Sequence, residues 1–198
     1  MTLEELNQRL CSAAQSVIDA EQELTEIDSH FGDADHGVTM SKIAAAIANA
    51  SGGTIKALLD DAAMGVMMIN GGSAVPLWNT WLDGLQEAAP DAGFVDAAGL
   101  KAMFGHALEV LSALSKAKVG DKTMMDALIP ATEALLNSTG DEAALFAAAA
   151  KAAQEGAENS RNFVSKFGRA RSYGEQTLGT PDAGAVSMSR FFAGLANV

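Results

Sequence analysis

The sequence predicts an all-α protein, an up-and-down bundle of eight antiparallel helices. Alanine, the strongest helix former, supplies 39 of the 198 residues, and there are only four prolines. β-Branched residues are sparse, and no segment alternates apolar and polar residues over a useful length, which argues against strands. The short breaks between helical patterns favour antiparallel neighbours. No linker or change of composition divides the chain, so we expect one domain over residues 1–198.

Local signals place each helix in order. Thr2 and Glu5 have the spacing of a capping box and predict a first helix that runs to about Leu24. An acidic loop, residues 28–37, comes next. Apolar periodicity and Gly or Pro punctuation then predict seven further helices, at residues 38–50, 54–69, 75–89, 95–116, 122–137, 141–166 and 184–197. Pro130 is expected to kink the sixth helix of the eight.

Charge and composition limit the classes of function. The chain has 13 Lys and Arg against 25 Asp and Glu, a net charge of −12, which disfavours nucleic acid or an anionic membrane surface as a partner. The single cysteine, Cys11, excludes an internal disulfide and a multi-cysteine zinc site. No apolar run reaches the length of a membrane span, and the N-terminus lacks the basic region of a signal peptide. We therefore expect a soluble cytoplasmic protein.

The acidic loop is the first candidate site. Asp28, Asp33 and Asp35 lie within eight residues of one another. Carboxylates this close repel one another unless a cation lies among them, and hard oxygen ligands select Mg²⁺ or Ca²⁺. An EF-hand is excluded, because the twelfth position counted from Asp33 is Ala44 rather than Glu. The alternative is a solvated acidic turn in which Asp35 caps the next helix.

Three other loops carry weaker signals. The run 70–76 places two glycines and Ser73 before a helix, where free amides can cradle a phosphate. Gly120 and Asp121 precede another helix, which Asp121 can cap. In the last loop Arg169 can reach a phosphate, and Asp182 heads the final helix.

The positions of these four loops agree with one another. By the order given above, they precede the second, fourth, sixth and eighth helices. In an up-and-down bundle, loops before alternate helices lie at the same end. Connectivity alone therefore predicts that the four loops meet in one site.

The motifs also resemble those of a known family. Gly32-Asp33-Ala-Asp35-His36-Gly37-Val-Thr39-Met40, Gly120-Asp-Lys-Thr-Met124 and Gly168-Arg169-Ala, in this order and spacing, resemble the nucleotide-binding (DhaL-type) subunit of dihydroxyacetone kinase over essentially the whole chain. The resemblance implies an eight-helix antiparallel barrel, a single DhaL-type domain, that binds ADP or ATP at one end through two Mg²⁺ ions. It also implies a phosphotransferase that acts as one subunit of a ketose kinase, with the ketose held on a separate DhaK-type subunit.

The resemblance assigns roles residue by residue. It makes Asp28, Asp33 and Asp35 the magnesium ligands and, together with Arg169, the catalytic residues. The nucleotide contacts that it implies are His36, Gly37, Val38, Thr39, Ser73, Ala74, Ser115, Met124, Arg169, Asp182, Ala183 and Gly184.

Some positions depart from the family pattern and leave alternatives. The family's phosphate turn usually reads Gly-Gly-Ala-Ser-Gly-Pro, whereas residues 71–76 read Gly-Gly-Ser-Ala-Val-Pro. Such changes are either neutral or mark a related ketose kinase, for example one for a four-carbon sugar. The phosphoryl donor is either exchangeable ATP or a phosphotransferase-system protein that rephosphorylates a retained ADP, and a homodimer is left open. The alternative functions are a non-catalytic nucleotide-sensing regulatory subunit and the nucleotide domain of a fatty-acid kinase.

Overall fold

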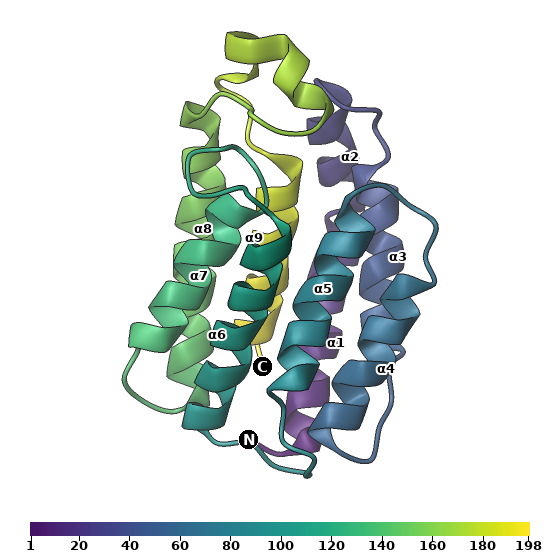
Figure 1. The fold of residues 1–198 in the computed structure, drawn as a ribbon, viewed down its shortest axis with the longest axis vertical. Helices are drawn as coiled ribbons and strands as arrows, with labels where there is room; N and C mark the ends of the chain where they lie inside the picture. The colour runs from purple at the N-terminus through teal and green to yellow at the C-terminus, as the bar shows by residue number, and fades with distance from the viewer.

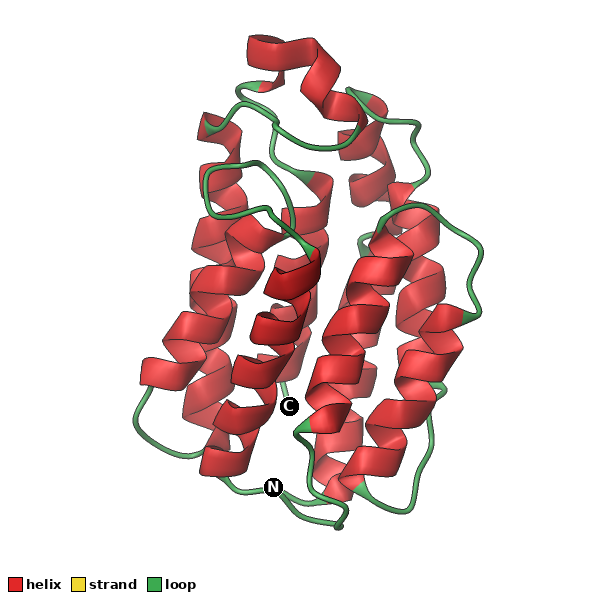
Figure 2. Ribbon diagram, in the orientation of Figure 1, coloured by secondary structure: helices red, strands yellow, loops and turns green.

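In the computed structural model, which describes residues 1–198, all regular secondary structure is helical except for one β-bridge between Thr2 and Phe94 (Figure 2). Two 3₁₀ segments, η1 (Ser160–Asn162) and η2 (Arg169–Thr177), lie between the last two α-helices. None of the helices combines the length and the apolar character that crossing a membrane requires. The nine α-helices are α1 (Leu3–Asp19), α2 (Glu21–Ser29), α3 (His36–Ala48), α4 (Ile55–Met67), α5 (Ala74–Glu87), α6 (Ala97–Leu114), α7 (Met125–Asn137), α8 (Glu142–Asn159) and α9 (Ala183–Ala196).

Eight of these helices pack into a closed antiparallel ring, whose arrangement can be followed in Figure 1. From α3 to α9 each helix packs against the next one in the chain, and α1 packs against both α3 and α9, which closes the ring. The remaining helix, α2, continues from α1 towards the upper end in Figure 1 and packs on α3. The predicted all-α, up-and-down architecture is therefore confirmed, with α2 as an addition to the eight.

Two predicted helix boundaries are wrong. The first helix does not run unbroken to Leu24: the backbone leaves helical geometry at Ala20, and α2 begins at Glu21. α3 passes close to this break, since a Cβ on Gly37 would overlap the carbonyl oxygen of Glu21. The helix expected over 141–166 ends at Asn159. Beyond this point the carbonyl oxygens of Ser160 and Phe163 accept from Lys122, in the loop before α7, instead of continuing the helix.

Aromatic side chains fill the interior of the ring. Trp78 and Trp81 of α5 are buried inside the bundle. Both make edge-to-face contacts with Phe191 of α9, at ring-centroid distances of 5.1 and 5.7 Å. Phe104 of α6 and Phe146 of α8 extend the cluster. Each such aromatic pair stabilises the fold by about 0.5–1.5 kcal/mol beyond the contribution of buried area. The aromatic cluster therefore helps to hold the helices of the ring together.

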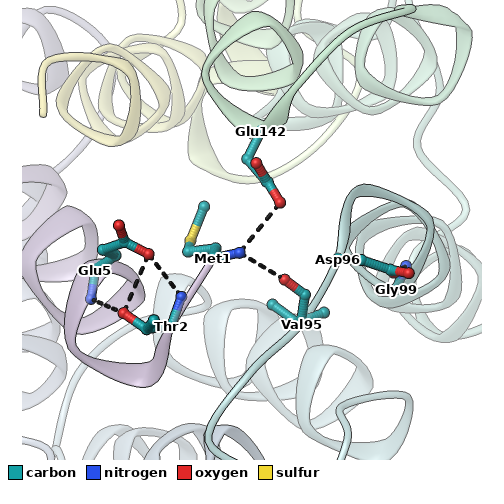
Figure 3. A network of polar contacts seen from close by, with 7 residues as sticks. All are labelled: Met1, Thr2, Glu5, Val95, Asp96, Gly99 and Glu142. Atoms are coloured by element: carbon teal, nitrogen blue, oxygen red, sulfur yellow. Dashed lines mark hydrogen bonds and ion pairs between the residues drawn. The ribbon is translucent and has the colours of Figure 1, made fainter.

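The lower end of the ring is held by polar contacts (Figure 3). The Met1 amino group donates to the Val95 carbonyl oxygen at 2.9 Å and to Glu142 Oε1 at 3.1 Å. Thr2 and Glu5 form the expected capping box at the start of α1. These bonds join the starts of α1, α6 and α8 at the end opposite the candidate site.

Candidate functional site

A cavity of about 730 Å³ lies at the upper end of the ring. The four loops singled out in the sequence all contribute to its wall, as the alternation of helix directions predicted. Because α1 and α2 are separate helices, these loops precede α3, α5, α7 and α9 rather than the second, fourth, sixth and eighth helices. A cavity of this size falls in the range that holds small molecules and cofactors.

Three carboxylates gather at one side of the cavity. Asp28, in the last turn of α2, and Asp33 and Asp35, in the loop after it, each bring a carboxylate oxygen within 4.8 Å of the others. Asp28 Oδ2 accepts hydrogen bonds from the amides of Asp35 and His36, at 3.2 and 3.4 Å. Asp35 is the N-cap residue of α3, yet its side chain makes no capping bond and stays available. Three hard oxygen donors in this arrangement fit Mg²⁺.

Arg169 reaches this cluster from the opposite side of the cavity mouth. Its Nη2 lies 2.7 Å from Asp33 Oδ2, although the side chain is 71% exposed. The rings of Phe31 and Tyr173 meet beside this ion pair, with centroids 5.2 Å apart. The loop between α8 and α9, residues 160–182, therefore contacts the acidic loop across the mouth of the cavity.

The start of α5 presents amides without protein acceptors. Gly72, Ser73 and Ala74 line the cavity, and their backbone N–H groups donate to no protein acceptor. Ser73 is the N-cap residue, but its side chain makes no capping bond. Pro76 has no N–H and lies in the first turn, where none is needed. Free amides at the positive end of a helix are suited to bind an anion.

The loop before α7 differs from the expectation for Asp121. The helix begins at Met125, so Asp121 does not cap it. Asp121 instead accepts from the Lys118 amide and lies 2.6 Å from Lys166 Nζ. Asp126, one turn further on, takes the amides of Gly120 and Thr123. The sequence predicts Asp121 as the acceptor at this helix start, whereas in the structure Asp126, inside α7, accepts the loop amides.

Two titratable groups lie near the start of α9: its N-cap Asp182, and His36, the first residue of α3. Asp182 caps the helix as expected and accepts from the Ala185 amide at 2.8 Å. Burial raises the pKa of Asp182 to about 7. Burial lowers the pKa of His36, despite the opposing effect of Asp28, and the His36 Nε2 lies 3.2 Å from the Ser187 hydroxyl. Both groups are therefore favoured in their neutral forms by removal from water.

Most of the residues chosen from the sequence line this cavity. Gly37 and Val38 do not: Gly37 packs against α2, and Val38 points outward with 43% of its surface exposed. The residues that do are Asp28, Asp33, Asp35, His36, Thr39, Ser73, Ala74, Ser115, Met124, Arg169, Asp182, Ala183 and Gly184.

Sequence reasoning missed several parts of the wall. The side chains of Leu77, Trp78 and Leu114 line it, and nothing in their helical spacing separates them from ordinary core residues. Phe31 also lines the cavity, and its position between Asp28 and Asp33 in the sequence gives no signal of that. The motif Gly120–Met124 predicts no role for Lys122, although this residue is 4% exposed and contributes to the cavity wall. The sequence signal for a special role of Lys122 is a lysine at a predicted helix start in a strongly acidic chain.

Two known proteins are similar in sequence to this chain. The chain is 36% identical over 185 residues to D-erythrulose kinase of Mycolicibacterium smegmatis, which covers 89% of this chain and 32% of that protein. It is 31% identical over 173 residues to the ADP-binding subunit DhaL of PEP-dependent dihydroxyacetone kinase 2 of Listeria innocua, covering 83% of this chain and 80% of the subunit. The chain thus spans about a third of the length of the erythrulose kinase.

The fold leads to the same group of proteins. The crystal structure of dihydroxyacetone kinase from C. freundii in complex with AMP-PNP and Mg²⁺ superposes with a TM-score of 0.74 at 23% identity. The match covers 96% of this chain and 33% of that one. Residues 30–197 match the model of the DAK2 domain. The chain therefore belongs to the DAK2 domain family.

Proposed function

We propose that this chain is the nucleotide-binding, DhaL-type subunit of a ketose kinase, with residues 1–198 acting as one domain. In this role it binds ADP or ATP with Mg²⁺ and supplies the phosphoryl group to a ketose held on a separate subunit. The observation that carries the proposal is the pairing, in one cavity, of a three-carboxylate cluster with uncapped helix amides. The names of the relatives, an ADP-binding subunit and kinases of dihydroxyacetone and erythrulose, support it.

Electrostatics explain why this site needs both features. A chain with a net charge of −12 repels a polyphosphate at long range. Binding then requires cations between the carboxylates and the phosphates, together with donors aimed directly at phosphate oxygens. Asp28, Asp33 and Asp35 would hold two Mg²⁺ ions, which neutralise phosphate charge when bound. The amides of Ser73 and Ala74 and the Arg169 guanidinium would hold phosphate oxygens, and Met124 and Leu77 would contact the base.

The ketose is expected to come with a partner. The residues proposed to bind the nucleotide line the cavity, and phosphoryl transfer needs the acceptor in line with the donor. We infer that a DhaK-type, ketose-binding subunit docks over the open upper end. The donor is then either exchangeable ATP or a phosphotransferase-system protein that rephosphorylates bound ADP. The similarity to erythrulose kinases favours including four-carbon ketoses among the substrates to be tested.

The binding part of this proposal is tested by calorimetry and thermal unfolding. Mg²⁺ and ADP together, at about a hundredfold excess over Kd, should stabilise the parent by about 2.7 kcal/mol, a rise of several degrees in Tm. ADP with EDTA should give a much smaller shift. Asp33→Ala and Asp35→Ala should lose Mg²⁺-dependent ADP binding and keep the helical circular dichroism of the parent. Unchanged binding in either variant would falsify the metal assignment.

The catalytic part is tested with a ketose-binding subunit. The chain alone should phosphorylate neither dihydroxyacetone nor erythrulose, and activity should appear only after mixing with that subunit. Arg169→Ala should lower the activity of the mixture. Nucleotide released by denaturing the purified protein separates the donors, since retained ADP indicates a phosphotransferase-system donor. Sugar-dependent ATP consumption by the isolated chain would contradict the two-subunit arrangement, and binding without transfer would favour a nucleotide sensor.

A further inference from the structure

A buried lysine beside the cavity is bound only by backbone. Lys122 is 4% exposed, and four carbonyl oxygens share the three N–H donors of its ammonium group. The distances from Nζ are 2.9 Å to Ser160, 3.1 Å to Phe163, 2.7 Å to Thr177 and 2.6 Å to Thr180. None of these bonds is to a carboxylate. Carbonyl oxygens thus replace the water shell of the cation, as they do for K⁺ in a selectivity filter.

The four carbonyl groups belong to both ends of one loop. Ser160 and Phe163 follow the end of α8, while Thr177 and Thr180 come just before α9. The amide of Ser165 donates to Thr177 Oγ1 at 3.1 Å, which closes the neck of the loop between them. The segment outside this neck, residues 166–176, carries Arg169. The ammonium group of Lys122 therefore fastens both ends of this segment to the loop before α7, whereas the contacts between Lys166 and Asp121 hold one end only.

Placing a cation here has a conformational and an electrostatic cost. Lys122 has a φ of 61°, in the left-handed region that residues with a Cβ seldom adopt. Burial lowers the pKa of its ammonium group, while Asp182 and Asp126 act in the opposite direction. An apolar residue would fill the same space without the cost of removing a charge from water. The charge is therefore best explained by what it holds together.

We propose that Lys122 is a positioning residue of the nucleotide site, a built-in cation that sets the 166–176 segment and the start of α9 against the loop before α7. This inference rests on the proposed function, because the parts that it aligns are Arg169, Asp182 and Met124, three lining residues from two different loops. Lys122 acts through them: it has the geometry of an anchor, with its protons directed at carbonyl groups rather than into the cavity.

The test removes the ammonium group and then returns it in solution. Lys122→Gly deletes the side chain and installs the residue that tolerates a positive φ, so backbone strain does not complicate the result. The four carbonyl oxygens then face a space that a free ammonium ion can occupy and that tetramethylammonium is too large to enter. Lys118→Ala, an exposed lysine of the same loop, is the matched control.

Two quantities are measured at equal ionic strength in ammonium chloride and in tetramethylammonium chloride. One is amide hydrogen exchange of residues 166–176 without nucleotide, and the other is the dissociation rate of Mg²⁺·ADP. In Lys122→Gly we expect both to rise about tenfold, a change of about 1.4 kcal/mol, with the ring helices still protected. Ammonium should return both towards the parent values, tetramethylammonium should not, and Lys118→Ala should behave as the parent does.

Parent-like exchange and dissociation in Lys122→Gly overturn the inference, and so does an equal response to the two salts. If the variant does not fold, restoration of the fold by ammonium alone supports the inference, and failure in both salts overturns it. The exchange measurement needs no nucleotide. A parent protein that does not bind Mg²⁺·ADP therefore counts against the proposed function alone, while loop exchange still decides the role of Lys122.

Discussion

The two ends of the ring begin their helices in different ways. At the lower end, each helix starts with a residue whose side chain accepts a hydrogen bond from the first turn, and these caps are Thr2, Thr54, Asp96 and Asp141. At the upper end, the N-cap residues of α3, α5 and α7 make no such bond. Only α9, capped by Asp182, follows the pattern of the lower end.

The difference separates stability from binding. A side-chain cap contributes about 1 kcal/mol, and the upper end lacks this contribution most clearly at α5. At α3 and α7 other side chains accept the first amides: Asp28 accepts from His36, and Thr123 Oγ1 accepts from Met125. The start of α5 leaves amide donors and a positive helix end facing the cavity, where an anion can take the place of the cap. Functional sites commonly carry such local departures from optimal stability. The comparison predicts that changes at the upper end alter ligand binding and changes at the lower end alter stability.

The largest expected effect concerns Asp182, the exception at the upper end. Its pKa is about 7 in the folded protein against 3.8 for the unpaired group, so folding favours the protonated form. The stability that this group contributes is fully present below pH 4 and is lost as the pH rises to about 7. The upper bound is about 4 kcal/mol, reduced by partial access of water.

Asp182→Asn tests this because asparagine is also a good cap. The free energy of unfolding, measured from pH 4 to 8 by urea denaturation, should fall less steeply with rising pH in the variant than in the parent. Comparison of the two profiles removes the contributions of Asp126 and His36, which titrate in both proteins. Parallel profiles would show that Asp182 is ionised in the folded protein at pH 5.

The sequence predicts the local features of the two ends better than the contacts between residues that lie far apart in the chain. The capping box of Thr2 and Glu5 is a local pattern, and the structure has it. The sequence also predicted that the four loops meet at one end, because the alternating direction of successive helices depends only on the order of the elements along the chain. The role of Lys122 could not be predicted, since its four partners lie 38 to 58 residues away in the chain. The failed cap at Asp121 has the same origin, because its carboxylate is bound by Lys166, 45 residues away.

A smaller effect is expected when a cap is added to the upper end. Ser73→Asp places a carboxylate at the start of α5, where it interacts favourably with the helix dipole and stabilises the free protein by about 0.5 kcal/mol. The same carboxylate would accept hydrogen bonds from the free amides and repel phosphate, so the Kd for Mg²⁺·ADP should rise about tenfold. Ser73→Asn, similar in size and neutral, is the control. Equal affinities of the two variants for Mg²⁺·ADP would mean that these amides do not face the phosphates.

The smallest effect is expected at the lower end, where Asp96→Ala removes the cap of α6. The carboxylate of Asp96 accepts from the Gly99 amide at 2.7 Å, and its loss should cost about 1 kcal/mol and lower Tm by a few degrees. The Kd for Mg²⁺·ADP should stay the same, because α6 begins at the lower end of the ring (Figure 1), whereas loops of the upper end line the cavity. Urea denaturation and calorimetry on the same sample measure the two quantities. Asp96→Asn should recover most of the stability, since asparagine caps as well as aspartate does. If Asp96→Ala lowers the affinity for Mg²⁺·ADP while its stability falls by no more than the expected ~1 kcal/mol, the two ends of the ring are coupled. The helix caps of the lower end and the ligand-facing amides of the upper end would then not act independently.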